Sequence, residues 1–243
     1  MSINLQSRTA VITGGSRGIG LAIAERLLGA GASVAITGIT QGHLDEASRT
    51  LAEAADGGQR LLALRADVRD PDEAAQMVDE TARRFGGLDI LVNNAAIGLF
   101  APVAQMTIDD WRRVLDTNLN GVFYCTRAAI PRLRERGGGW IINISSLAGK
   151  NAFADGAAYC ASKSALNAFS DALMQEVRYE NIRVSCVMPG SVRTRFSSGG
   201  DKAGTEWKLA ADDVAQVVCD LLAHPDRSLP SRVELRPSRP PRK

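Results

Sequence analysis

The feature that most limits the fold of this chain is a short apolar run that leads directly into a glycine-rich turn and then a helix. Residues 9–13 read TAVIT, residues 14–20 read GGSRGIG, and residues 21–31 place apolar side chains at helical spacing before a terminal glycine. A strand, a glycine turn and a helix in this order form the context of a dinucleotide-binding unit. The glycines permit a tight turn and close approach of a ligand, and the helix N-terminus presents free N–H groups to a pyrophosphate. A plain glycine-rich loop between strand and helix is the alternative.

The rest of the chain continues this alternation of strands and helices. Short β-rich runs are expected as strands at residues 33–37, 60–66, 90–92, 140–144, 184–188 and 233–235. Helical patterns occupy about residues 44–55, 71–85, 109–136 and 212–223, with a further helix around Tyr159. The pattern predicts an α/β fold, a Rossmann-type doubly wound parallel sheet flanked by helices on both faces within a single domain. Pro131 predicts a kink in the longest of these helices.

Composition and charge argue against several other classes of protein. The formal net charge is +2, and residues 227–243 hold six basic residues and one acid, so residues 1–226 carry about −3. The body therefore lacks the basic stripe of a nucleic-acid-binding protein, and the basic, proline-rich tail is expected to be solvated. No apolar run is long enough to cross a membrane and no signal-peptide pattern is present, so we expect a cytoplasmic protein without a membrane partner. The four cysteines are scattered and do not cluster with histidines, so neither a metal site nor a disulfide is expected.

The end of the second strand bears on which dinucleotide binds. In dinucleotide folds an acid at this place hydrogen-bonds the ribose 2′-hydroxyl of NAD and would repel the 2′-phosphate of NADP. Residues 33–42 contain no acid, and Arg17 in the glycine turn can pair with a phosphate. Both observations favour NADP(H) over NAD(H), although Gly38 and Ile39 provide no second basic residue and Arg17 can equally be a plain surface residue. Asp67, at the end of the third strand, faces the binding crevice and is expected near the adenine.

The candidate catalytic residues are Ser146, Tyr159 and Lys163. Tyr159 and Lys163 are four residues apart and therefore share one face of a helix. An ammonium group stabilises a nearby phenolate and lowers its pKa, and a hydroxyl such as that of Ser146 can hold a substrate oxygen. Such a set is suited to proton transfer to or from a carbonyl or alcohol oxygen. On an arbitrary helix the same tyrosine–lysine pair would be two surface residues without a catalytic role. The cofactor-binding pattern upstream is what favours a catalytic pair here.

The chain resembles the short-chain dehydrogenase/reductase family over residues 8–223. The resemblance rests on motifs in the order and spacing of that family, namely TGGSRGIG at 13–20, Asp67-Val68, NNAA at 93–96, Asn118, Ser146, Tyr159 with Lys163, and PGSVRT at 189–194. It implies that Tyr159 is the general acid in reduction and that Ser146 binds the carbonyl oxygen. It also implies that Lys163 lowers the tyrosine pKa and binds the nicotinamide ribose, and that Asn118 anchors a water chain that resupplies protons.

The resemblance further implies a set of cofactor contacts spread over the carboxyl ends of the strands. They are Gly14, Ser16, Arg17, Gly18, Ile19, Gly20, Thr40, Asp67, Val68, Asn94, Ala95, Ala96, Tyr159, Lys163, Pro189, Gly190, Val192 and Thr194. The glycine turn would hold the pyrophosphate side and residues 189–194 would surround the nicotinamide. The hydride chemistry would belong to the cofactor, with the protein supplying orientation and electrostatics.

Within the family, the motifs are most similar to those of 3-oxoacyl-[acyl-carrier-protein] reductases. This implies an NADPH-dependent oxidoreductase acting on a carbonyl or a secondary alcohol. Where those reductases use basic residues to dock an acidic carrier, this chain has Gly137 and Glu180, with Arg136 and Arg178 as neighbours that could substitute. The alternatives are an NAD-dependent secondary-alcohol dehydrogenase and, from another class, a non-catalytic NADP(H)-binding regulator. The family also implies a homotetramer or homodimer built through the helix that carries Tyr159 and the helix before it.

Several loops are expected to enclose a small-molecule substrate. These are residues 96–100, 147–153 and 191–196, together with a shortened lid at 195–210 that contains Trp207. Their small or apolar side chains favour an uncharged or aliphatic carbonyl without identifying it. We assign residues 1–226 to the cofactor-binding and catalytic domain, and 227–243 to a last strand and the basic tail. Ala96 stands where the family prefers glycine, and the tail replaces the family's usual terminal Gly-Gly pair.

Overall fold

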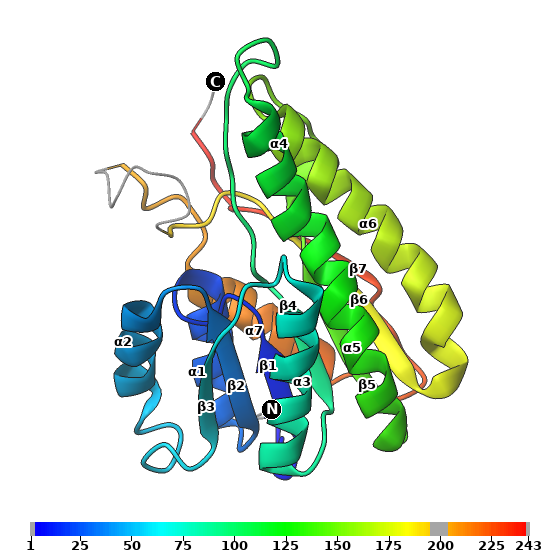
Figure 1. Cartoon of the computed structure of the whole chain (residues 1–243). Helices are drawn as coiled ribbons and strands as arrows, with labels where there is room; N and C mark the ends of the chain where they lie inside the picture. The colour runs from blue at the N-terminus through cyan, green and yellow to red at the C-terminus, as the bar shows by residue number, and fades with distance from the viewer. Residues whose placement is uncertain (1–2, 195–203, 242–243) are drawn as a thin grey trace.

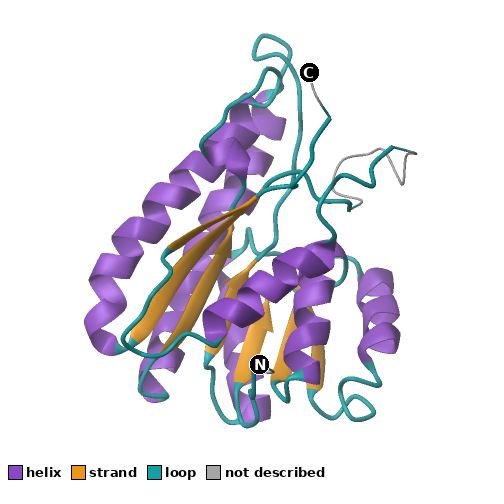
Figure 2. Ribbon diagram, turned by 180° about the vertical axis from the view of Figure 1, so that it is seen from behind, coloured by secondary structure: helices purple, strands orange, loops and turns teal. Residues whose placement is uncertain are grey.

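Strand pairing fixes the architecture of the chain. The computed structural model describes residues 3–194 and 204–241, and within them seven strands form one sheet in the order β3-β2-β1-β4-β5-β6-β7 (Figures 1 and 2). All neighbouring pairs are parallel. The strands are β1 (Thr9–Ile12), β2 (Ser33–Gly38), β3 (Leu61–Arg65), β4 (Ile90–Asn93), β5 (Gly139–Ile144), β6 (Ile182–Pro189) and β7 (Arg232–Leu235). The chain therefore winds outward from β1 in one direction and then from β4 in the other, which confirms the doubly wound α/β fold. The crevice between the carboxyl ends of β1 and β4 is where such sheets bind ligands.

Helices cover both faces of the sheet (Figures 1 and 2). One face is covered by α1 (Gly18–Gly29), α2 (Gln41–Leu51) and α7 (Ala211–Leu222). The other is covered by α3 (Pro71–Phe85), α5 (Gly121–Glu135) and α6 (Ala157–Val177). The shorter helix α4 (Ile108–Leu115) extends past the sheet beside α6. Short turns of helix also occur at Leu147–Gly149 and Arg178–Glu180.

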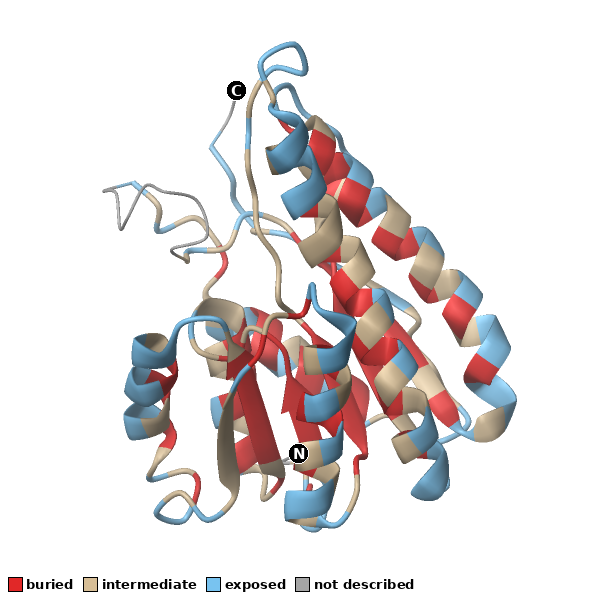
Figure 3. Cartoon of the chain, viewed as in Figure 1, coloured by how far each residue is buried: buried red, intermediate tan, exposed pale blue. Residues whose placement is uncertain are grey.

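The core consists of two apolar layers, one on each face of the sheet. Neighbouring strand residues alternate between them, so that Ala10 and Ile12 pack toward α1 while Val11 packs toward α3 and α5. Because both faces are covered, the central strands are buried along their whole length, as Figure 3 shows. Within the described residues, no helix is both long enough and apolar enough to span a bilayer.

The long helix that the sequence predicts over residues 109–136 is divided in the structure. Helix α4 is followed by a single π-helical turn at Asp116–Asn120 and then by α5. Pro131 does not end α5, which continues to Glu135 because buried residues on both sides of the proline, Ala129 and Leu133, hold it against the sheet. The helical hydrogen-bonding pattern therefore changes at the π turn, which carries Asn118, whereas α5 continues through Pro131.

Candidate active site

Ser146, Tyr159 and Lys163 lie together at the carboxyl end of β5. Tyr159 and Lys163 occupy consecutive turns of α6, and the Lys163 Nζ lies 5.8 Å from the centroid of the Tyr159 ring. Ser146 follows β5 directly, and its side chain is hydrogen-bonded to that of Tyr159. The Ser146 hydroxyl also accepts a hydrogen bond from the Ala148 backbone N–H at 3.1 Å, which fixes its orientation. A hydrogen bond thus joins a serine that follows a strand to a tyrosine on a helix, and both hydroxyl groups can contact the same substrate atom.

The neighbouring Ser145 has a different role. It is buried, and its hydroxyl donates to Asn167 Oδ1 at 2.6 Å inside the contact between β5 and α6. Successive residues of an extended segment point to opposite sides, so only one of the two serines can face Tyr159. The hydrogen bond to Tyr159 belongs to Ser146, as the spacing of the motif suggested.

Burial shifts the pKa values of both helix residues. Lys163 is 2% exposed and its Nζ donates to the Ile144 carbonyl at 2.9 Å. Its burial lowers the pKa of the ammonium group to about 8. Burial also raises the pKa of Tyr159, and the hydrogen bond with Ser146 opposes that rise. In this arrangement the Lys163 Nζ binds a carbonyl and faces the ring, and burial is the largest cause of the shift in the Tyr159 pKa. A lowering of that pKa by Lys163 stays a prediction.

The buried lysine predicts how stability depends on pH. Between about pH 8 and the ordinary lysine pKa of 10.5, the unfolded chain holds a proton that folded Lys163 has released, so folding becomes more favourable as pH rises. Lys163→Met abolishes this dependence. We expect the free energy of unfolding of the variant, relative to the wild type, to fall by about 1–2 kcal/mol between pH 7 and pH 9.5. Urea denaturation of both proteins at the two pH values measures this change, and a pH-independent difference would contradict it.

Asn118 is placed by the π turn and is completely buried. Its Oδ1 accepts from the Ile97 N–H at 2.8 Å, and its Nδ2 donates to the Ile97 carbonyl at 2.9 Å and to Ser162 Oγ at 3.0 Å. Ser162 in turn donates to the Tyr159 carbonyl at 2.8 Å. The amide of Asn118 therefore ties the loop after β4 to the helix turn that carries Tyr159 and Lys163. A proton relay through Asn118 stays a prediction.

The glycine turn is packed against the end of β4 so closely that side chains cannot fit. A Cβ on Gly20 would lie 2.5 Å from both the Gly14 carbonyl oxygen and Asn94 Nδ2, and a Cβ on Gly14 would lie 2.9 Å from Ala95 Cα. Asn94 Nδ2 donates to the carbonyls of Thr13 and Gly14 at 3.0 and 3.1 Å. The predicted contacts Asn94 and Ala95 therefore also shape the turn itself.

The N-terminus of α1 is available to an anion. Its N-cap residue, Arg17, makes no side-chain capping hydrogen bond, and the first turn contains no acid. Gly18 has a φ of +58°, and a Cβ there would stand 3.5 Å from Thr194 Cγ2, so the predicted nicotinamide loop lies beside the turn. Free helical N–H groups, a turn in which Gly14, Gly18 and Gly20 leave the backbone open to close approach, and an adjacent cation fit the pyrophosphate of a dinucleotide.

Other predicted cofactor residues lie at the neighbouring strand ends. Ser16 lies against the end of β2, where its Oγ would be 3.1 Å from a Cβ on Gly38. Thr40 is exposed at the N-cap of α2.

The predicted contacts after β3 are Asp67 and Val68. The Asp67 carboxylate is bound by the guanidinium of Arg69, and the hydrogen bonds from Arg69 are the main reason that the pKa of Asp67 lies below its usual range. Val68 is buried and packs on Gly121, where a Cβ would lie 2.8 Å from Val68 Cγ2.

The expected nicotinamide loop follows β6. Pro189 ends that strand, and the Gly190 N–H donates to the Leu235 carbonyl on β7 at 2.7 Å. Val192 forms an isolated bridge with Leu209. The remaining predicted contacts are at the start of α1 and after β4: Ile19 is half-buried in the first turn of α1, and Ala96 is half-buried in the loop that begins with Asn94.

Two phenylalanines form an aromatic wall beside the catalytic tyrosine. The rings of Phe100 and Tyr159 are 5.7 Å apart edge to face, and those of Phe100 and Phe153 are 5.8 Å apart. Phe100 and Phe153 remain 43% and 48% exposed. Both come from loops that the sequence assigns to the substrate side. Part of the predicted lid, residues 195–203, lies outside the described residues.

The tail supplies a contact that the sequence did not predict. A Cβ on Gly190 would lie 3.0 Å from Pro237 Cδ and 3.3 Å from Leu147 Cδ1. Parallel pairing of β7 with β6 carries the chain past Gly190, so Pro237 borders the loop expected at the nicotinamide. A motif comparison gives no signal for this contact, because it depends on the register of the last strand.

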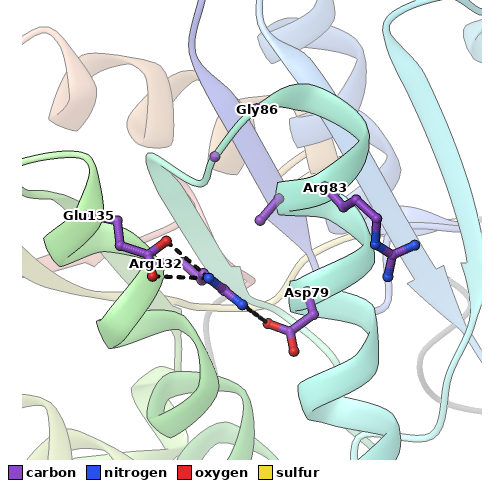
Figure 4. Close-up of a pocket in the computed structure, with 7 residues that line it drawn as sticks. Asp79, Arg83, Gly86, Arg132 and Glu135 are labelled. Carbon is purple, nitrogen blue, oxygen red and sulfur yellow. Dashed lines mark hydrogen bonds and ion pairs between the residues drawn. The ribbon is translucent and has the colours of Figure 1, made fainter.

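Two hollows of similar size lie at the opposite end of the sheet, where strands begin. One, of about 510 Å³, lies between the ends of α3 and α5 (Figure 4). Its Arg132 is ion-paired with both Asp79 and Glu135. The other, of about 490 Å³, is bordered by Asp89 and Trp140 at the beginnings of β4 and β5. Neither adjoins Tyr159.

Over residues 3–194 and 204–241, no group of three or more histidine, cysteine or acidic side chains is arranged to hold a metal ion.

Comparison with known proteins identifies the family to which this chain belongs. The short chain dehydrogenase family matches residues 8–203. The chain is 40% identical over 197 residues to the 3beta-hydroxysteroid dehydrogenase 2 of Eggerthella lenta, covering 80% of this chain and 75% of that protein. It superposes with a TM-score of 0.87 on a short-chain alcohol dehydrogenase of Sinorhizobium meliloti described as putative, at 32% identity and 96% coverage of both chains. The TM-score is also 0.87 for an alcohol dehydrogenase of Thermococcus sibiricus in complex with 5-hydroxy-NADP, at 26% identity and 97% and 99% coverage. This chain therefore belongs to the short-chain dehydrogenases, a family of nicotinamide-dependent oxidoreductases.

Proposed function

We propose that this protein is an NADP(H)-dependent oxidoreductase that interconverts a carbonyl and a secondary alcohol. The observation that carries the proposal is the cluster of Ser146, Tyr159 and Lys163 at the same sheet end as the glycine turn. A dinucleotide bound to the turn supplies the hydride acceptor or donor. The rest of the chemistry requires only that the protein hold the substrate oxygen and move one proton.

Tyr159 is suited to be the proton donor in the reductive direction. Burial raises its pKa, so the phenol stays protonated at neutral pH. Ser146, hydrogen-bonded to the same phenol, can donate a second hydrogen bond to the substrate oxygen as negative charge develops there. Lys163 lies over the tyrosine ring and stays mostly charged at neutral pH, because its pKa is about 8, and its charge would favour the phenolate that remains after proton transfer. Asn118, which fixes this helix turn, is a positioning residue.

The charges near β2 support NADP(H) over NAD(H). Residues 33–42 contain no acid that would repel a 2′-phosphate, and Arg17 is exposed at the N-cap of α1. The Thermococcus sibiricus structure was solved with an NADP derivative. We expect the KM for NADPH to be at least about tenfold below that for NADH, which corresponds to one charge-assisted hydrogen bond. Steady-state kinetics with both cofactors measures this ratio, and a lower KM for NADH would overturn the cofactor assignment.

The aromatic wall supports an alicyclic substrate. Phe100 and Phe153 present half-exposed ring surface next to Tyr159, which can contact the apolar face of a saturated ring. The Eggerthella lenta relative is named for a ring alcohol, a 3β-hydroxysteroid. Docking of an acyl carrier protein is less well supported, because Glu180 is ion-paired with Arg134. A panel containing cyclohexanone, a 3-oxosteroid and an acetoacetyl thioester distinguishes these substrate classes.

Exposed apolar side chains also support self-association through α4 and α5. Trp111 on α4 and Phe123 on α5 are 38% and 48% exposed. These helices lie on the same side of the sheet as α6, which is the arrangement expected for a homodimer or homotetramer of this family. Analytical ultracentrifugation of the wild type and of Phe123→Ser tests this proposal.

A further inference from the structure

We propose that Arg65, at the end of β3, is the second cation that holds the 2′-phosphate of NADP(H), with Arg17 as the first. The inference rests on the proposed preference for NADP(H) and names a residue that determines it. The sequence offers Arg17 alone, because neither Gly38 nor Ile39 at the end of β2 is basic. A second positive charge is instead provided by Arg65 on the neighbouring strand β3.

Register places Arg65 directly beside the end of β2. Strands β2 and β3 are parallel, and the Cα of Arg65 is the partner of the Cα of Gly38. Paired residues on neighbouring strands are about 5 Å apart, which is shorter than an arginine side chain. Arg65 therefore reaches the space beside Gly38, where the ribose of a dinucleotide lies in this kind of fold.

The alternation of side chains places Arg65 on the same face as the glycine turn. Leu61 and Ala63 pack into the core on the α1 and α2 side, whereas Leu62 and Leu64 pack on the opposite side. With a period of two, Arg65 belongs to the side of Leu61 and Ala63. The position of Gly38 agrees, because a Cβ on it would approach Ser16 Oγ at 3.1 Å. Ser16 precedes Arg17 in the glycine turn, so both arginines belong to segments that meet at the end of β2.

The acid nearest to Arg65 already has a stronger partner: Arg65 contributes to the lowered pKa of Asp67, but the largest contribution comes from Arg69. The nearest acid in the sequence, Asp67, is held by Arg69 through its side chain and its backbone N–H. Neither Arg17 nor Arg65 forms an ion pair with any residue in the described part of the chain, and both are exposed. Thr40 caps the adjacent helix α2 without a side-chain hydrogen bond, and the first turn of α2 contains no acid. The N-terminus of α2 therefore adds to the positive field at the same place.

A 2′-phosphate between Arg17 and Arg65 would supply the counter-charge that the protein lacks there. NAD(H) carries a hydroxyl at the same position and would leave both guanidinium groups in water. Charge-assisted hydrogen bonds from guanidinium to phosphate are the strong kind, so each arginine should contribute measurably to discrimination. Arg65 would act on affinity and not on the hydride-transfer step, because two strands, β2 and β1, separate β3 from β4, and Tyr159 lies farther along the sheet order, beside the end of β5.

Binding of two fragments tests the inference without any turnover. Adenosine 2′,5′-bisphosphate carries the 2′-phosphate and AMP lacks it, and isothermal titration calorimetry measures the affinity of the full chain for each. We expect the wild type to prefer the bisphosphate and Arg65→Met to lose about 10- to 100-fold of that affinity with its AMP affinity unchanged. Arg65→Lys should retain part of the preference. Arg49→Met, which removes an exposed arginine from α2, is the matched control and should behave as the wild type.

The possible results separate the inference from the proposal on which it rests. A wild type that binds AMP as tightly as the bisphosphate would overturn the preference for NADP(H), and the role of Arg65 with it. A wild type with the preference and an Arg65→Met variant that keeps it would overturn the role of Arg65 alone. Equal losses in Arg65→Met and Arg49→Met would show a general charge effect and would also overturn it. Thermal denaturation confirms that each variant is folded before titration.

Discussion

Tyr159→Phe should reduce kcat for ketone reduction by about 100- to 10,000-fold, the range associated with loss of a general acid. The substitution removes the phenol hydroxyl that Ser146 contacts and leaves the ring that packs against Phe100. Because Lys163 faces the ring and binds the Ile144 carbonyl, the fold around the site should survive. Steady-state kinetics with NADPH and the ketone that gives the highest wild-type rate measures the effect.

Tyr179→Phe is the matched control for this prediction. Tyr179 is 90% exposed in the short helix after α6, so loss of its hydroxyl should leave kcat within about twofold of the wild type. Dissociation constants for NADPH should change much less than kcat in Tyr159→Phe, since the main action of the Tyr159 hydroxyl is on the substrate oxygen. If Tyr159→Phe retained more than about a third of wild-type kcat, a different group would have to donate the proton.

Gly20→Ala should remove most of the affinity for the dinucleotide. Its Cβ would lie 2.5 Å from the Gly14 carbonyl and from Asn94 Nδ2, both of which are fixed by hydrogen bonding, so the glycine turn must move. We expect a loss of about 1–3 kcal/mol in the free energy of unfolding, typical of an overpacked core, and at least about a tenfold weaker binding of NADPH. Urea denaturation and fluorescence titration measure the two effects.

The same helix provides the control for this substitution. Gly29 is at the other end of α1, and a Cβ on it would meet nothing within 4 Å. Gly29→Ala should therefore leave NADPH binding unchanged and stabilise the fold by up to about 1 kcal/mol. Equal cofactor affinity in Gly20→Ala and Gly29→Ala would show that the turn does not bind the dinucleotide in the proposed way.

Local patterns in the sequence predict much of the fold. The glycine-rich stretch at 14–20 leads from the end of β1 into the first turn of α1, as predicted, because glycine spacing and apolar periodicity are properties of neighbouring residues. Alternation of strands and helices predicts a doubly wound sheet, since parallel strands need crossover helices. The π turn that places Asn118 was not predicted, because periodicity over 109–136 fits one continuous helix as well as two.

Contacts between distant strands are what the sequence could not provide. Arg65 becomes a neighbour of Gly38 only through the register of β3 on β2, and Pro237 borders Gly190 only because β7 pairs with β6. The pKa of Tyr159 also depends on parts of the chain that are distant in sequence. Spacing predicts that Lys163 lies one turn away, but the effects of burial depend on the packed site and raise the tyrosine pKa. Strand register and burial are properties of the whole fold.

Isotope transfer is the most direct test of the claim that Ser146, Tyr159 and Lys163 form a working reductase site. The chain would be incubated with NADPH or NADH that carries deuterium at both C4 positions of the nicotinamide and with the ketone panel, and the products analysed by mass spectrometry. We predict a single deuterium on the carbinol carbon of at least one product, with a larger yield from NADPH and almost none from Tyr159→Phe. Absence of deuterium from every product with both cofactors, in a chain that still binds NADPH, would contradict the account and favour a non-catalytic NADP(H)-binding regulator.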